Sequence, residues 1–134
     1  MSHEVVDGPD MPRPLGPYSP VVRVGHLLFL SAQTGVDQST GAVPDGGFDA
    51  ECRQAFVNLG QALRASGSDL SHVVKATILY ADLADLPTVN KIYAEVFPTN
   101  PPARTAAIVG LAGGRRISVD AIAVSPGKPS LSDH

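Results

Sequence analysis

The final apolar segment of the chain has hydrophobic residues on both faces of a strand pattern. Ile117, Val119, Ala121 and Ala123 would lie on one face, and Ser118, Asp120, Ile122 and Val124 on the other. Because successive side chains of a strand point to opposite sides of its sheet, a strand of this composition must be covered twice. One layer of helices covers only one face. We therefore expect the second face to pack against further copies of the chain in a homo-oligomer.

The first half of the chain shows a hairpin pattern followed by a helical pattern. Two apolar runs, 21–24 and 27–31, flank Gly25-His26, which predicts a tight turn between antiparallel strands. From Asp49 the apolar period becomes helical, and Gly67 closes the predicted helix. The apolar stripe of this helix consists of Cys52, Phe56, Leu59 and Leu63. A cysteine in such a stripe favours a buried packing thiol over a nucleophile.

The second half repeats the alternation of strand and helix. A strand pattern over 73–81 precedes a helix over 86–97, which Asp85 can cap. Two further strands, 103–109 and 116–124, are predicted to be joined by a hairpin turn at Gly113-Gly114. The order ββ, α, β, α, ββ predicts an α+β fold with a single sheet and both helices on one face.

Length and composition limit the domain organisation and the partners. The 134 residues fit one domain, which we place at 14–124, after a flexible segment over 1–13 and before a disordered tail over 125–134. No apolar segment approaches the roughly 20 residues that cross a bilayer, so no membrane partner is expected. The first 13 residues lack the pattern of a signal or transit peptide, which predicts a cytoplasmic protein.

The net charge and the cysteine and histidine content argue against nucleic-acid-binding and metal-binding proteins. A net charge of −3 argues against nucleic-acid binding, because such binding depends on many lysines and arginines. The basic pair Arg115-Arg116 favours a solvated hairpin tip over a nucleic-acid contact. Cys52 is the only cysteine and the four histidines have no ligand spacing, so we expect neither a disulfide nor a metal.

Arg104 is the strongest candidate for a binding residue. It stands in Pro101-Pro102-Ala103-Arg104-Thr105, at the head of a strand that we expect to be buried. A guanidinium is always charged, and its planar fork of donors matches a carboxylate. Two interpretations remain open at this point, which are a carboxylate-bearing ligand and an internal salt bridge to Asp120 or another acid.

Five short motifs, in order along the chain, resemble one known family. They are Gly16-Pro17-Tyr18-Ser19, the run from Gly25 to Gln33, Val89-Asn90 before Tyr93, Pro102-Ala103-Arg104, and Asp120-Ala121-Ile122-Ala123. Over roughly residues 14 to 124 the chain resembles the Rid (YjgF-like) family. The resemblance implies a chorismate-mutase-like fold, a homotrimer with a central barrel, and three ligand clefts between subunits. It also implies hydrolysis of enamines and imines, such as 2-aminoacrylate and 2-iminobutanoate, to 2-oxo acids and ammonia without a cofactor.

The same resemblance assigns roles to individual residues. Arg104 would bind the carboxylate of a small-molecule substrate, as its chemistry alone suggests. Tyr18 would border the cleft, and Ser31 would hydrogen-bond a ligand or water, although a serine at a strand end can also satisfy backbone groups. The main chain around Ala106 would line the cleft, where many relatives have a cysteine.

Ser118 is the main departure from the family pattern. Active deaminases of the family have at this position a glutamate that positions the attacking water, and a serine hydroxyl is no general base at neutral pH without a partner. Asp120 points to the same side of the strand but lies about 6–7 Å further along, where it is either catalytic or structural.

Two functions remain in view after this departure. Positioning alone can accelerate imine hydrolysis, so we expect a hydrolase resembling 2-iminobutanoate/2-iminopropanoate deaminases. The alternative is a divergent or non-catalytic trimer that binds small carboxylates in the same clefts.

Overall fold

The predicted hairpin forms around Gly25, which connects β2 (Val21–Val24) to β3 (Leu27–Thr34). Gly25 has a φ of 59°, in the left-handed region that only glycine adopts without strain. β3 runs three residues beyond the predicted end, and its register shifts between Leu30 and Gln33 where it pairs with the last strand. This irregularity lies at the point where the apolar run that predicted the strand ends.

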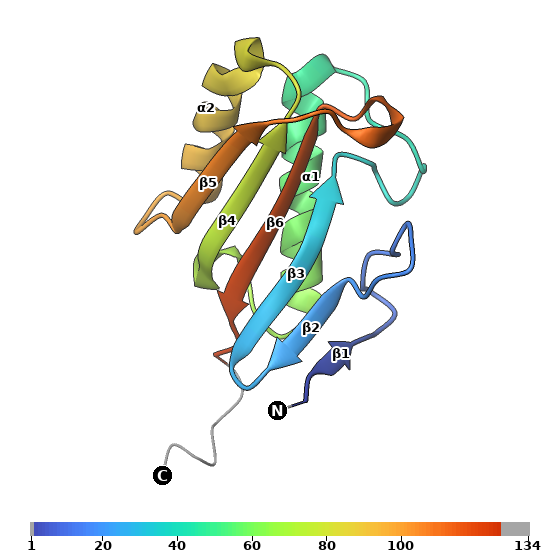
Figure 1. Cartoon of the computed structure of the whole chain (residues 1–134), viewed down its shortest axis with the longest axis vertical. Helices are drawn as coiled ribbons and strands as arrows, with labels where there is room; N and C mark the ends of the chain where they lie inside the picture. Colours follow the sequence, from blue (N-terminus) through green and yellow to red (C-terminus); the bar gives the residue numbers. More distant parts are fainter. Residues whose placement is uncertain (1, 127–134) are drawn as a thin grey trace.

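The computed structural model describes residues 2–126, in which six strands form one mixed sheet of order β1-β2-β3-β6-β4-β5 (Figure 1). The other strands are β1 (Glu4–Val6), β4 (Val73–Tyr80), β5 (Ala103–Ile108) and β6 (Ile117–Val124). Neighbouring strands are antiparallel except β4 and β5, which are parallel and connected by a helix. The apolar last strand, β6, lies between β3 and β4.

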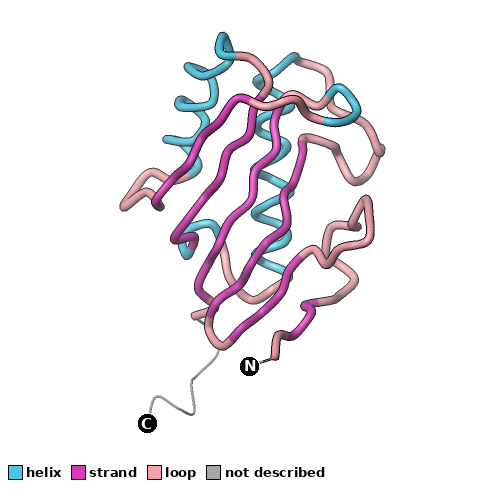
Figure 2. Tube along the Cα trace, viewed as in Figure 1, coloured by secondary structure: helices cyan, strands magenta, loops and turns pink. Residues whose placement is uncertain are grey.

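Helices α1 (Gly47–Ala65) and α2 (Leu86–Val96) pack on one face of the sheet, so the predicted α+β architecture is confirmed (Figures 1 and 2). Gly67 ends the first helix, as predicted, with a φ of 82° and with its N–H donating to the Arg64 carbonyl. Within residues 2–126, no helix is long and apolar enough to cross a membrane.

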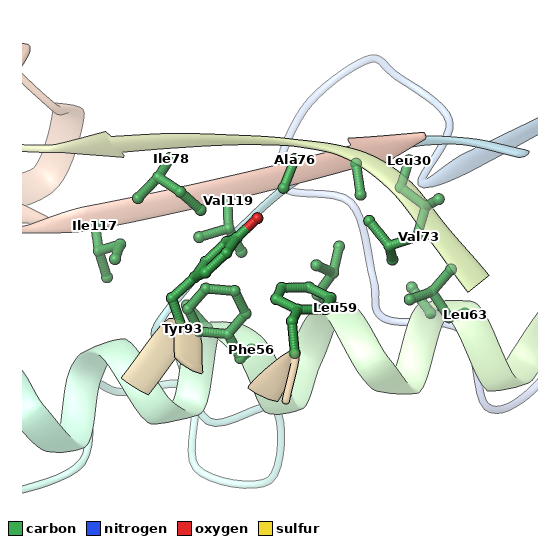
Figure 3. Packing of buried hydrophobic residues seen from close by; sticks show 14 of the residues in the cluster. Leu30, Phe56, Leu59, Leu63, Val73, Ala76, Ile78, Tyr93, Ile117 and Val119 are labelled. Carbon is green, nitrogen blue, oxygen red and sulfur yellow. The ribbon is translucent and has the colours of Figure 1, made fainter. Parts of the chain in front are cut away.

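The hydrophobic core fills the space between this face and the helices (Figure 3). Leu59 and Leu63 of α1 and Ile78 of β4 are fully buried there. Cys52 is also fully buried, which confirms the packing interpretation of its thiol. The opposite face of the sheet, here called the open face, presents Phe29 with 40% of its surface exposed.

The predicted hairpin between the last two strands is wrong. β5 pairs with β4 and not with β6, and the connection over 109–116 carries the chain past β4. This connection contains a short 3₁₀ turn, Ala112–Gly114, and is longer than a tight hairpin allows. Arg116 is therefore no solvated tip, because its guanidinium is paired with Asp85 at 2.9 Å. Asp85 in turn makes no side-chain cap to α2.

The ends of the chain also differ from expectation. Within the predicted flexible segment, β1 pairs antiparallel with β2, and Met11 is buried against the core. A three-residue strand has too few residues for a recognisable pattern. Ser125 is buried, with its N–H donating to the His26 carbonyl, although we placed it in a disordered tail. The rest of that predicted tail, from 127 on, lies outside the described residues.

Candidate carboxylate-binding site

Arg104 lies on an exposed edge strand. We predicted that this strand is buried, but β5 pairs on one side only and its side chains are largely uncovered in the single chain. Arg104 is in register with Ala76 of β4, so its side chain is on the helical face. There the guanidinium carbon lies 4.9 Å from the centroid of the Tyr93 ring.

The structure separates Arg104 from Asp120. Asp120 is in register with Thr77, whereas Arg104 is in register with the neighbouring residue, Ala76. The two side chains therefore point to opposite faces of the sheet. Among residues 2–126, no carboxylate forms an ion pair with Arg104. The internal salt bridge to Asp120 is thus excluded, and the guanidinium is available to an external anion.

The main chain at Ala106 also faces the uncovered edge. The Val109 N–H donates to the Tyr80 carbonyl, which fixes the residues of β5 that bond to β4. Since backbone groups of successive strand residues point to alternate sides, the N–H groups of Arg104 and Ala106 point away from β4. The guanidinium of Arg104 and these two backbone donors are therefore all carried by the edge strand.

Tyr18 and Ser31 lie together at the opposite side of the molecule. The Tyr18 hydroxyl accepts a hydrogen bond from the Leu15 N–H at 3.1 Å, and 45% of the residue is exposed. The Ser31 hydroxyl donates to the Ser19 carbonyl at 2.7 Å. Ser31 therefore holds the segment next to Tyr18, and its oxygen keeps acceptor capacity for a ligand.

Ser118 and Asp120 lie on the open face of β6. Ser118 is 7% exposed and is in register with Thr34 of β3. Thr34 and Tyr18 line the same small cavity, of about 50 Å³. Burial raises the pKa of Asp120, opposed by a hydrogen bond from Thr77 and by the charge of Lys75. The carboxyl thus faces a polar row on the open face, away from Arg104.

The predicted site residues form two sets in one chain. The first set, on and around β3 and β6, is Tyr18, Ser31, Ser118 and Asp120; the second, on β5, is Arg104 and Ala106. β4 separates the sets, and the side chains of Arg104 and Ser118 point to opposite faces of the sheet. One chain therefore does not close a site around a small ligand.

Sequence analysis missed Tyr93 as a neighbour of Arg104. Tyr93 was named only as the end of one family motif, and its buried position on α2 is that of an ordinary packing residue. In the described part of the chain, no group of three or more His, Cys, Asp and Glu side chains is placed to hold a metal ion.

These features define a small α+β protein with an arginine at the edge of a mixed sheet. The family model for endoribonuclease L-PSP matches residues 9–125. The human 2-iminobutanoate/2-iminopropanoate deaminase is 41% identical over 121 residues, which cover 90% of this chain and 88% of the human protein. The chain belongs to the endoribonuclease L-PSP family, which is the Rid (YjgF) family, and the resemblance seen in its motifs is confirmed.

Solved structures agree with this assignment. RidA from the Antarctic bacterium Psychrobacter is 30% identical, with a TM-score of 0.84 over 90% of this chain and 98% of that one. E. coli TdcF with bound serine is 26% identical, with a TM-score of 0.82 over 90% of this chain and 98% of that one.

Proposed function

We propose that this protein hydrolyses reactive 2-imino and enamine acids of the 2-aminoacrylate and 2-iminobutanoate type to 2-oxo acids and ammonia. The observation that carries the proposal is Arg104, a cation exposed at a sheet edge with no acidic partner among residues 2–126. The name of the human relative supports the reaction, and the serine bound to TdcF shows that a relative accepts a small amino acid.

The reaction needs a carboxylate anchor and a placed water. The Arg104 fork and the Ala106 N–H hold the substrate carboxylate, which fixes the adjacent imine carbon. Water adds its oxygen to that carbon, and its proton is transferred to the imine nitrogen. The hydroxyl proton of this carbinolamine then moves to the amino nitrogen, the carbon–nitrogen bond breaks, ammonia leaves and the 2-oxo group forms. No electrons are exchanged with another molecule.

A cleft between two copies combines the two sets of residues. One copy contributes Arg104 and Ala106, and its neighbour contributes Tyr18, Ser31 and Ser118. The separation of these sets within one chain supports this arrangement, and so does the apolar open face. We propose a homotrimer with three such clefts.

In this proposal, Ser118 and Asp120 lie on the side of the cleft from which the water attacks. The Ser118 hydroxyl orients the water, and Asp120 is the nearest acid on the same strand and face. Because no glutamate stands at 118, a carboxylate-binding trimer without turnover is the second candidate function. The loss of that carboxylate is the specific observation in its favour.

The proposal predicts that Arg104→Ala stays folded and loses activity. An amino-acid oxidase generates 2-iminobutanoate in situ, semicarbazide traps the free imine, and the protein competes with the trap. Wild type should lower semicarbazone formation, whereas Arg104→Ala should lose about 100-fold or more in kcat/KM, because a charged anchor is removed. Turnover equal to wild type in the variant would contradict the role of Arg104. Binding of 2-oxobutanoate without turnover in wild type would favour the second candidate.

A further inference from the structure

The ring of Tyr93 contacts the guanidinium of Arg104 on the helical face of the sheet. The guanidinium carbon lies 4.9 Å from the ring centroid, within the range of a cation–π contact. We propose that Tyr93 is a positioning residue that presents Arg104 to the substrate carboxylate. This inference rests on the carboxylate-binding role given to Arg104 under the proposed function.

The Tyr93 ring is itself held rigidly. It is 7% exposed and packs against Phe97 at 4.8 Å and edge-on to Phe56 at 6.3 Å, in the core shown in Figure 3. Its hydroxyl donates to the Pro102 carbonyl at 3.5 Å, two residues before Arg104. The same side chain therefore contacts both the guanidinium and the backbone that leads into β5.

A contact through the ring leaves the arginine donors unused. The guanidinium has five N–H donors, and the attraction of its charge to the face of the Tyr93 ring needs no hydrogen-bond acceptor. An exposed arginine without such support loses substantial rotamer freedom when it binds a ligand. Tyr93 reduces this loss of rotamer freedom, because it already holds the Arg104 guanidinium in place before the carboxylate binds.

Arg116 shows what a structural arginine looks like in this chain. It also lies over an aromatic ring, with 5.1 Å between its guanidinium carbon and the centroid of Phe48. Its guanidinium is, however, paired with the Asp85 carboxylate at 2.9 Å. Arg104 has the ring without the acid among residues 2–126, so the missing carboxylate is assigned to the ligand.

Three variants separate positioning from packing. Tyr93→Leu removes the ring, Tyr93→Phe keeps the ring and removes the hydroxyl, and Phe97→Leu disturbs the same aromatic cluster. Calorimetry with 2-oxobutanoate measures Kd, the imine assay measures KM and kcat, and thermal melting measures stability. Tyr93→Leu should raise Kd and KM about 3- to 30-fold with little change in kcat. Tyr93→Phe should stay within about twofold of wild type, and Phe97→Leu should lower Tm without raising Kd.

The inference is overturned if Tyr93→Leu binds 2-oxobutanoate as tightly as wild type, or if Phe97→Leu weakens binding equally. A wild type that binds 2-oxobutanoate without turnover refutes the deaminase proposal, while the Kd series still decides the role of Tyr93. A wild type that does not bind 2-oxobutanoate overturns both.

An NMR measurement on folded wild type covers the case in which Tyr93→Leu fails to fold. The Arg104 Nε–H signal, assigned by its loss in Arg104→Ala, should be shifted upfield by the ring and should move on addition of 2-oxobutanoate. An unshifted signal overturns the inference.

Discussion

Two residues of the candidate site differ in what their side chains can do. Arg104 is charged at any physiological pH and lies over Tyr93, and under the proposed function its charge and donors bind the substrate carboxylate. Ser118 is buried on the open face, and a hydroxyl can orient water but does not take up its proton near neutral pH. Binding and chemistry are therefore expected to respond separately to substitution.

Ser118→Glu tests whether a missing carboxylate limits the rate. A glutamate at this position would supply a general base beside the placed water, and general-base catalysis typically contributes about 100-fold or more. We expect kcat for 2-iminobutanoate to rise at least tenfold with KM nearly unchanged. Ser118→Gln, which matches the size of glutamate without its charge, is the control. An equal gain in both variants, or in neither, would show that the carboxylate is not limiting.

Cys52 should be unreactive in the folded protein. It is fully buried in the stripe of α1, and desolvation is the largest cause that raises its pKa to about 12. The thiol is therefore protonated at pH 8, and a thiol-specific reagent also lacks access to it. We expect no labelling at pH 8 in buffer and one equivalent per chain in denaturant. Rapid labelling of folded protein would contradict this packing.

At the scale of elements, the end of β3 is held closely against α1. Asn58 of α1 is buried, and its side-chain amide donates to the carbonyls of Thr34 and Val36. Gly35, between them, approaches Glu51 so closely that a Cβ would clash with the Glu51 carbonyl and lie 2.6 Å from its Cγ. The end of β3 that α1 holds includes Thr34, which is in register with Ser118 of β6.

Gly35→Ala should therefore destabilise the fold. The added methyl has to displace the backbone of α1 or of β3, and overpacking of this kind costs about 1–3 kcal/mol. Gly110→Ala is the matched control, because a Cβ there meets no atom within 4 Å. Denaturant titration should show a lower free energy of unfolding for the first variant and a change within about 0.5 kcal/mol for the second. Equal values for the two variants would refute the close approach.

At the scale of the whole molecule, the open face of the sheet is the surface that exposes apolar side chains to solvent in a single chain. Phe29 is 40% exposed there and is in register with Val22 of β2 and Ile122 of β6. Apolar strands on an uncovered face are typical of an interface between copies. Under the proposed function, the division of the site residues between the two faces of the sheet requires the same assembly.

Phe29→Lys tests this assembly. Sedimentation of wild type should give the mass of three 13.9 kDa chains, and the variant should shift toward one chain because a charge is placed in an apolar interface. Val57→Lys, at a residue 55% exposed on α1, should leave the mass unchanged. The assembly variant should also lose imine turnover, since Arg104 and Tyr18 would no longer meet. A monomeric wild type with full activity would contradict the shared cleft.

Local patterns in the sequence determined the two helices, most strand positions and the candidate role of Arg104. The helical stripe through Cys52, the turn at Gly25 and the donor chemistry of a guanidinium each depend on residues close together in the chain. These features can be predicted without tertiary contacts, because they follow from the spacing of apolar residues and from the chemistry of single side chains.

Only the tertiary structure decided which strands pair and which side chains share a face. The insertion of β6 between β3 and β4 replaced the predicted hairpin, and the parallel pairing of β4 and β5 brought Arg104 onto Tyr93. β1 was missed because its order comes from pairing with β2. These outcomes depend on contacts between residues far apart in the sequence, which local periodicity does not encode. Sheet order and register alone placed Arg104 and Ser118 on opposite faces.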